Sequence, residues 1–302
     1  MTTSHFIEIP QGRFHYYKTG TQGDQIFFCH GNSMSAGTYL PFLEKLASPI
    51  SDLSQPDLPQ SDFMGFQILA PDVRGHGSST KENTQKVKSW DIFLKDLEQL
   101  VQSITRPPVI GMGHSMGGYF IYAAAAMYPH LFSKIILLDP IILPRKVVWS
   151  ASLARTLKLA KHYPLARLAL KKKSQFSSRQ QALAHYSGKG MFKTWEARFV
   201  QAYVDTAMEK DPRDETCSLC CAPEFEARMY TLVPFNTWRH AGHIHVPTLV
   251  VRGQHSEMFA RQSGLLLEHK IKNCHFIEME NLGHFFTMED PDAVVSVLKQ
   301  HL

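Results

Sequence analysis

Long apolar runs are missing from this sequence. Stretches such as Val109–Gly113 and Ile135–Leu138 are far shorter than the ~20 apolar residues that a helix needs to cross a bilayer. The start of the chain has neither a basic segment nor an apolar one, so we expect no secretory signal. Both absences argue against a membrane-spanning or an exported protein.

Cysteine is scarce as well, and its number is odd. Five cysteines among 302 residues do not suggest a disulfide framework, so a reducing, cytoplasmic setting fits better than an extracellular one. Hydrophobic residues make up 44% of the chain and charged residues 20%, which excludes wholesale disorder. We therefore expect a folded, cytoplasmic protein.

Acidic residues are absent from Arg145 to Lys193, a segment that holds twelve lysines and arginines. Such a shift marks a segment with a surface role of its own. Residues 149–161 place apolar side chains on one helical stripe with basic ones beside it, which favours a helix packed on its own domain with a solvated basic face. Weak peripheral contact with an anionic membrane is the alternative. Nucleic acid is not an expected partner, because aromatic–basic interleaving and binding motifs are absent.

Short apolar runs without alternation recur along the chain and predict strands that are buried on both faces. These runs are Ile26–Cys29, Phe66–Ala70, Val109–Met112, Lys134–Leu138 and Thr248–Val251. Helical periods lie between them over Trp90–Ile104 and Tyr119–Tyr128, and a last helix starts at about Pro291. Alternating runs at Phe6–Ile9 and Arg13–Tyr17 predict an antiparallel hairpin. Together they predict an α/β fold whose mainly parallel sheet is covered by helices on both faces.

Two segments interrupt this alternation. Residues 47–65 have the composition of a loop and predict a surface insertion. Residues 141–245 show almost no strand signal and several helical periods, which predicts a helical cap inserted between two strands of the sheet. The core domain is then formed by residues 1–140 and 246–302.

A serine between two glycines follows one buried strand and precedes the alanine-rich helix. The segment is Gly113-His-Ser115-Met-Gly117. On a tight strand-to-helix turn, glycines two positions either side let the chain close, and the serine hydroxyl is held above the sheet edge. Ser115 is therefore the candidate nucleophile.

A serine nucleophile needs a base and a site for the negative charge that develops on the substrate. His284 follows a candidate strand at His275–Met279, and an imidazole can take up and return a proton near neutral pH. The backbone N–H groups of Asn32 and Met116 are the expected oxyanion donors. Ser33 is not separable from Asn32 by sequence.

Four segments in this order resemble the α/β-hydrolase superfamily. They are His30-Gly31, the run from Asp72 to Ser78, the Gly113–Gly117 turn and the segment around His284. The resemblance covers residues 1–140 and 246–302, and it implies an eight-stranded, mainly parallel sheet with an inserted helical cap. It implies structural roles for Asp72, Arg74 and His76, and a serine in place of aspartate at the turn disfavours dehalogenase and epoxide-hydrolase chemistry. No metal or organic cofactor is expected.

The acidic member of the triad is the point at which this sequence departs from the family pattern. Relatives usually place an aspartate in the loop after the strand that follows the cap. Here that loop holds Ser256, which cannot carry a charge, and then Glu257. We therefore expect Glu257 to orient His284, with Asp139 after Lys134–Leu138 as the alternative.

The cap also carries a cluster of cysteines and histidines. Cys217, Cys220 and Cys221 precede three histidines between 240 and 245, but the spacing fits no standard zinc finger. Packed thiols are the favoured interpretation.

These features predict a serine hydrolase that cleaves carboxylic esters through an acyl-enzyme, with a small-molecule substrate. The apolar and basic cap favours a lipid-derived acyl chain, and its basic residues allow an acidic head group. A carbon–carbon bond hydrolase or a thioesterase would use the same triad, and both alternatives stay open. A non-catalytic small-ligand receptor on the same fold is the alternative of a different class.

Overall fold

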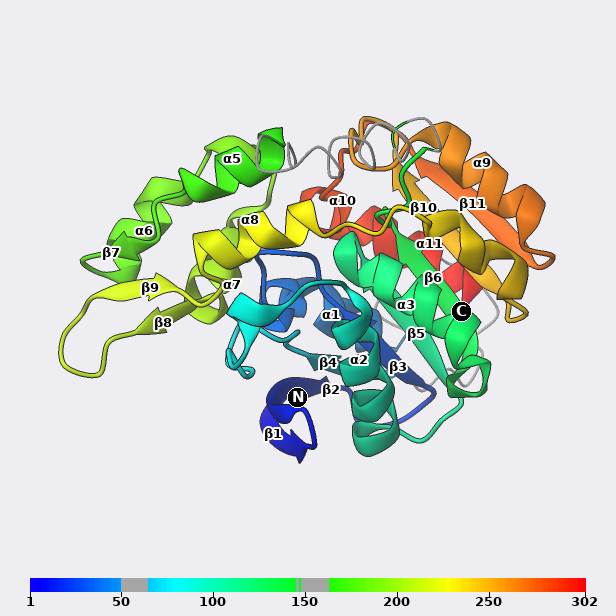
Figure 1. Ribbon diagram of the computed structural model, residues 1–302, viewed down its shortest axis with the longest axis horizontal. Coiled ribbons are helices and arrows are strands. Elements are labelled where there is room, and N and C mark those ends of the chain that lie inside the picture. Colours follow the sequence, from blue (N-terminus) through cyan, green and yellow to red (C-terminus); the bar gives the residue numbers. More distant parts are fainter. Residues whose placement is uncertain (50–64, 145–146, 148–162) are drawn as a thin grey trace.

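A computed structural model describes residues 1–49, 65–144, 147 and 163–302 (Figure 1). The helix predicted over 149–161 and most of the insertion predicted over 47–65 lie outside these residues.

An eight-stranded sheet forms the centre of the molecule (Figure 1). Its strands, in sheet order, are β1 (Thr3–Ile9), β2 (Gly12–Thr19), β4 (Gln67–Pro71), β3 (Gln25–Cys29), β5 (Val109–His114), β6 (Phe132–Leu138), β10 (Thr248–Gly253) and β11 (Cys274–Met279). The pairs β1–β2 and β2–β4 are antiparallel and all the others are parallel. The predicted sheet, with its antiparallel start, is confirmed.

Helices cover the two faces of this sheet. They are α1 (Leu40–Ala47), α2 (Asp91–Ile104), α3 (Met116–Met127), α9 (Arg261–Lys270), α10 (Phe286–Glu289) and α11 (Pro291–His301). Alternate residues of β3 enter two separate cores, Phe28 with α1 and α11, and Phe27 with α2, α3 and α9. This alternation is the physical reason why the central strands are apolar at nearly every position.

The segment between β6 and β10 holds most of the remaining elements. They are α5 (Pro164–Leu170), β7 (Gln175–Phe176), α6 (Arg179–Tyr186), α7 (Ala197–Thr206), β8 (Met208–Lys210), β9 (Cys217–Leu219) and α8 (Pro223–Thr231). Strands β7, β9 and β8 form a small antiparallel sheet that the sequence did not predict. Strands of two or three residues are too short to show alternation. The domain boundaries at 140/141 and 245/246 stay a prediction.

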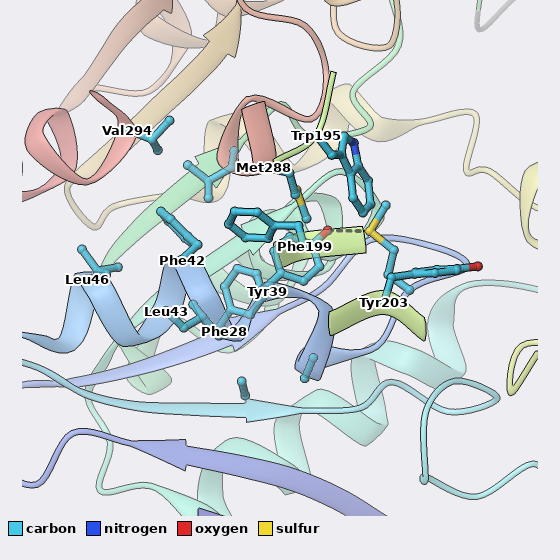
Figure 2. Close-up of a cluster of buried hydrophobic side chains, with 14 of the residues drawn as sticks. Phe28, Tyr39, Phe42, Leu43, Leu46, Trp195, Phe199, Tyr203, Met288 and Val294 are labelled. Atoms are coloured by element: carbon cyan, nitrogen blue, oxygen red, sulfur yellow. Dashed lines mark hydrogen bonds between the residues drawn. The ribbon is translucent and has the colours of Figure 1, made fainter. Parts of the chain in front are cut away.

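One hydrophobic cluster runs from the core into this segment. Figure 2 shows Phe199 and Tyr203 of α7 beside Tyr39 and Phe42, and all four side chains are buried. A Cβ placed on Gly37 would lie 2.5 Å from the side chain of Thr206 at the end of α7, so only glycine permits this approach. Helix α7 is therefore held against the core by close packing.

The cysteines of the cap are packed thiols, as expected. Cys217, Cys220 and Cys221 are all free and buried, and burial raises the pKa of the Cys220 thiol to about 12. Within residues 1–49, 65–144, 147 and 163–302, no group of three or more His, Cys, Asp and Glu side chains is placed to hold a metal. Over the same ranges, no helix is both long and apolar enough to cross a membrane.

Candidate active site

Ser115 lies on the turn between β5 and α3, in a backbone conformation that few non-glycine residues adopt. Its φ angle is 56° and its N–H donates to the carbonyl of Leu138, 2.9 Å away. A Cβ placed on Gly117 would lie 2.1 Å from the carbonyl oxygen of Cys29, so this position requires glycine. The turn therefore has the tight, strained geometry that the sequence predicts for a nucleophile.

His284 lies in the loop after β11 and reaches the serine. Its Nε2 accepts a hydrogen bond from the Ser115 hydroxyl at 3.0 Å, and its Nδ1–H donates to Asp139. The loop is held by Glu289, whose Oε2 accepts from the N–H of Gly283 at 2.7 Å. The structure thus brings the predicted nucleophile and the predicted base together.

Asp139 follows β6 and is the carboxylate that meets the imidazole. It is completely buried, its φ angle is 45°, and its Oδ2 accepts from the Nδ1–H of His284. Its Oδ2 also accepts from the Ser256 hydroxyl, whose oxygen in turn accepts from the N–H of Met258 at 3.2 Å. Ser256 therefore supports the carboxylate from the loop in which relatives carry the acid.

The sequence predicts that Glu257 orients His284, but the structure places Asp139 against the ring instead. The Glu257 side chain is exposed at the rim of the cavity, and in the part of the chain that the structure describes no hydrogen bond joins it to His284. Strands β6 and β10 are neighbours in the sheet, so their following loops meet at one edge. Position 256 points inward there and position 257 outward, which leaves Asp139 as the acid within reach.

A second histidine supports the loop of the first. The Nε2–H of His114 donates to the carbonyl of His284 at 2.9 Å, and its Nδ1 accepts from the Tyr39 hydroxyl at 2.7 Å. That hydroxyl oxygen also accepts from the N–H of Gly31. Burial lowers the pKa of His114 well below its usual value, so the ring is neutral and fits this pattern. One chain of hydrogen bonds thus links the base loop to the loop after β3.

The structure separates the two candidates for the first oxyanion donor. The Nδ1–H of His76 donates to the carbonyl of Arg74, so Nε2 is an acceptor and takes the N–H of Ser33 at 3.1 Å. Burial lowers the pKa of His76 to about 3, which keeps the ring neutral. Among the described residues, none accepts from the N–H of Asn32 or of Met116, and both residues line the same cavity as Ser115.

The segment from Asp72 to Ser78 lies beneath this loop. Asp72 accepts from the ring of His15 at 2.8 Å and from the N–H groups of Ala36 and Ser78. Within the segment, Arg74 forms a buried ion pair with Asp96. These contacts fit the structural role that the resemblance implies.

A cavity of about 1060 Å³ opens above Ser115, and its lining is mostly apolar. Aromatic and aliphatic side chains come from both the core and the cap, among them Trp90, Met191, Phe192, Tyr230 and Phe285. An exception is the ion pair of Lys172 and Glu226, whose Nζ and Oε2 atoms are 2.6 Å apart.

Sequence reasoning missed several of these residues. His114 adjoins the nucleophile, and that position was the one available signal for it. Tyr39 and Glu226 carry no local signal, because each meets its partner only through the fold. Ser256 was noted for its position but not as a partner of Asp139.

Comparison with known proteins gives one family. The family model described as the alpha/beta hydrolase fold matches residues 25–291. Over 296 residues the chain is 21% identical to "Peroxisomal membrane protein LPX1" of Saccharomyces cerevisiae, covering 92% of this chain and 74% of that protein. It is 34% identical to the monoglyceride lipase of Rattus norvegicus over 133 residues, which cover 42% of this chain and 39% of the lipase.

Solved structures agree on the fold. The thioesterase domain from the curacin biosynthetic pathway superposes with a TM-score of 0.77 at 16% identity, over 99% of each chain. At that identity the likeness concerns the fold alone.

Proposed function

This chain is a hydrolase of the α/β-hydrolase fold family, and from that premise we propose that it cleaves carboxylic esters through a covalent acyl-enzyme. In this proposal Ser115 is the nucleophile, His284 the general base and acid, and Asp139 the carboxylate that orients it. The observation that carries the proposal is the hydrogen-bonded chain of these three side chains at the floor of the cavity.

The first half of the reaction transfers the acyl group to the serine. The Ser115 Oγ attacks the ester carbonyl carbon while its proton passes to Nε2 of His284. The N–H groups of Asn32 and Met116 stabilise the resulting oxyanion, and Asp139 stabilises the imidazolium cation. The carbon–oxygen bond to the alcohol then breaks, and His284 returns the proton to the departing oxygen.

Water completes the second half by the same route. It attacks the acyl-enzyme while His284 accepts its proton, and the carboxylic acid leaves as Ser115 regains a proton. The neutral ring of His114 holds the backbone of His284 throughout, because it donates to the carbonyl of that residue. The two halves thus use groups of this chain and one water molecule.

The lining of the cavity supports an acyl ester with a long apolar chain. About 1060 Å³ bounded largely by aromatic and aliphatic side chains favours apolar ligands of considerable length. The monoglyceride lipase to which part of this chain is similar is named for an acyl ester substrate, which supports the same class.

Labelling with a fluorophosphonate probe tests the proposal. We expect rapid labelling of the wild-type protein and none of the Ser115→Ala variant, with matching loss of hydrolysis on p-nitrophenyl esters of graded acyl length. Loss of the attacking group typically costs ~10⁴–10⁶ in rate. A folded Ser115→Ala variant that kept more than a tenth of the activity would contradict the assignment, and an unlabelled wild type would favour a ligand receptor.

The same assay tests the two alternative activities, thioester hydrolysis and carbon–carbon bond hydrolysis. An acyl-CoA and a vinylogous diketone are offered beside the esters, because thioesterases and carbon–carbon bond hydrolases use the same triad. Esters should be the faster substrates. Turnover of the diketone alone would move the assignment to carbon–carbon bond cleavage.

We further propose weak peripheral contact with an anionic lipid surface through α5. Leu168 and Leu170 on this helix are 64% and 55% exposed, while Ala166 and Ala169 pack inward in a cluster with Ala227 of α8. Exposed basic side chains flank these leucines, with Arg167 before them and Lys171 and Lys173 after them. Apolar side chains beside cations suit the interface of a bilayer with negative charge.

A further inference from the structure

The ion pair of Lys172 and Glu226 is an expensive feature for an apolar cavity. The Lys172 side chain is 19% exposed and that of Glu226 only 5%. Removing two charges from water costs energy that their mutual attraction often fails to recover, and well-packed apolar residues commonly stabilise such a site better. Fold stability therefore gives little reason for charge at this place.

The position of the pair beside the reacting atoms suggests another reason. Lys172 also donates to the hydroxyl of Ser33 at 2.8 Å, and the side-chain amide of Asn32 donates to the backbone carbonyl of Glu226 at 3.3 Å. Asn32 carries one of the proposed oxyanion N–H groups. The pair is thus attached to the loop that would hold the substrate carbonyl, and both of its members line the cavity.

Lys172 and Glu226 do not use all of their hydrogen-bonding groups on each other and on Ser33. The Lys172 ammonium has three N–H bonds, of which Ser33 and Glu226 take two. Glu226 uses Oε2 for Lys172, and none of the described residues donates a hydrogen bond to its Oε1. One donor and one acceptor are therefore left near each other at the wall of the cavity.

We propose that this pair binds a neutral hydroxyl group of the substrate, placed within a few bonds of the scissile ester. A hydroxyl can accept from Lys172 and donate to Glu226 at the same time, which satisfies both. A carboxylate cannot donate and is repelled by Glu226, and an alkyl group leaves both charges short of a partner. The acidic head group that the basic cap allows is therefore not the ligand of Lys172.

The hydroxyl can belong to either half of the ester, and matched substrates distinguish the two sources. Hydroxyethyl decanoate is compared with propyl decanoate for the alcohol half, and methyl β-hydroxydecanoate with methyl decanoate for the acyl half. We expect the hydroxylated ester of one pair to have a kcat/KM about tenfold or more above its partner, because buried polar groups discriminate strongly against analogues that cannot pair with them.

The double variant Lys172→Met/Glu226→Leu removes the two charges together and leaves no unpaired ion. We expect its preference for the hydroxylated ester to fall to about one. The matched control is Lys171→Met/Glu224→Leu, which changes two exposed neighbours outside the cavity and should keep the wild-type ratio. Should the double variant fail to fold, Lys172→Met/Glu226→Met serves instead, since it also removes both charges and leaves neither a donor nor a charged acceptor for the hydroxyl.

This inference rests on the proposed ester hydrolysis, and a binding measurement keeps the two apart. Calorimetry with the Ser115→Ala protein compares hydroxyethyl decyl ether with propyl decyl ether, and methyl 3-hydroxydecyl ether with methyl decyl ether, neither pair of which can be hydrolysed. Tighter binding of one hydroxylated ether, lost when Lys172→Met/Glu226→Leu is added, supports the site even if no ester is turned over. The inference is overturned if neither pair of ligands shows a hydroxyl preference, if the preference survives in the double variant, or if carboxymethyl decanoate is preferred to hydroxyethyl decanoate.

Discussion

Two side chains share one oxygen of Asp139, and that arrangement determines how the acid can be tested. Oδ2 accepts from both His284 and Ser256, while Oδ1 is buried and has no hydrogen-bond partner among the described residues. We predict that Asp139→Asn lowers kcat by roughly 10³–10⁴-fold, because the amide no longer stabilises the imidazolium. Steady-state kinetics on a p-nitrophenyl ester measures this loss.

Glu257→Gln is the natural control for that variant. Its carboxylate is exposed and has no part in the chain of hydrogen bonds, so turnover should stay within about twofold of wild type. The opposite pattern, a collapse with Glu257→Gln and activity with Asp139→Asn, would return the role to Glu257.

Ser256 occupies the place from which a carboxylate could also reach the imidazole. We predict that adding Ser256→Asp to an inactive Asp139→Ser variant restores at least about tenfold in kcat, because the exchange moves the charge across a single hydrogen bond. The measured quantity is the activity of the double variant relative to Asp139→Ser. Equal activities would show that the loop after β10 cannot present an acid to His284.

At the scale of the element, α5 exposes Leu168 and Leu170 where an ordinary surface helix would carry polar residues, and Leu168 also lies at the edge of the cavity. We predict that Leu168→Gln/Leu170→Gln reduces sedimentation with vesicles that contain phosphatidylserine, because it removes the apolar contact area. Leu265→Gln on α9 changes a leucine that is 41% exposed elsewhere and should leave binding as it is.

The basic side chains at the end of the same helix allow a second test of this membrane contact. Replacing Lys171 and Lys173 by glutamine should weaken binding at low salt, whereas Lys88→Gln/Lys95→Gln should not. Equal binding of the wild-type protein to neutral and anionic vesicles would contradict the proposed contact and favour a basic face that is simply solvated.

The central strands show what a sequence can predict of its own fold. Ile26–Cys29 was predicted and Gln25–Cys29 is observed, because a strand buried on both faces must be apolar at nearly every position. The turn at Ser115 was equally predictable, since its glycines and its place between strand and helix are local features of the sequence. Elements defined by their own residues were therefore within reach.

Contacts between residues that are distant in the chain could not be predicted from the sequence. Spacing after β10 indicated a loop near His284, yet the acid that reaches the imidazole is Asp139, which follows a different strand, β6. Lys172 and Glu226 are far apart in the chain, and nothing local in either neighbourhood indicates the other. Identifying Asp139 as the acid and Lys172 with Glu226 as a pair therefore required the three-dimensional structure.

For the whole molecule, buried neutral histidines set the response to acid. Burial lowers the pKa of His30, His76 and His114, and the value for His76 is about 3. The unfolded chain binds protons at these residues below about pH 6.5, while the folded one does not. Stability from these groups is therefore fully present above that pH and is lost as the pH falls toward their folded pKa values.

We predict that the midpoint of urea unfolding decreases steadily from pH 7 to pH 5. Each such histidine contributes at most about 1.4 kcal/mol per pH unit to the free energy of unfolding. Most carboxylates titrate below this window, so the histidines dominate it. A midpoint that stayed constant or rose toward pH 5 would show that these rings are charged in the native state.

The shared cluster around Phe199 and Tyr39 has a consequence for how this protein can change over time. A shortened chain without residues 141–245 would leave Tyr39 and Phe42 facing water, and an apolar patch of that kind leads to aggregation. We therefore expect that the segment cannot be removed from this chain without loss of solubility. We expect the substrate range of this chain to change instead through single substitutions in the lining of the cavity.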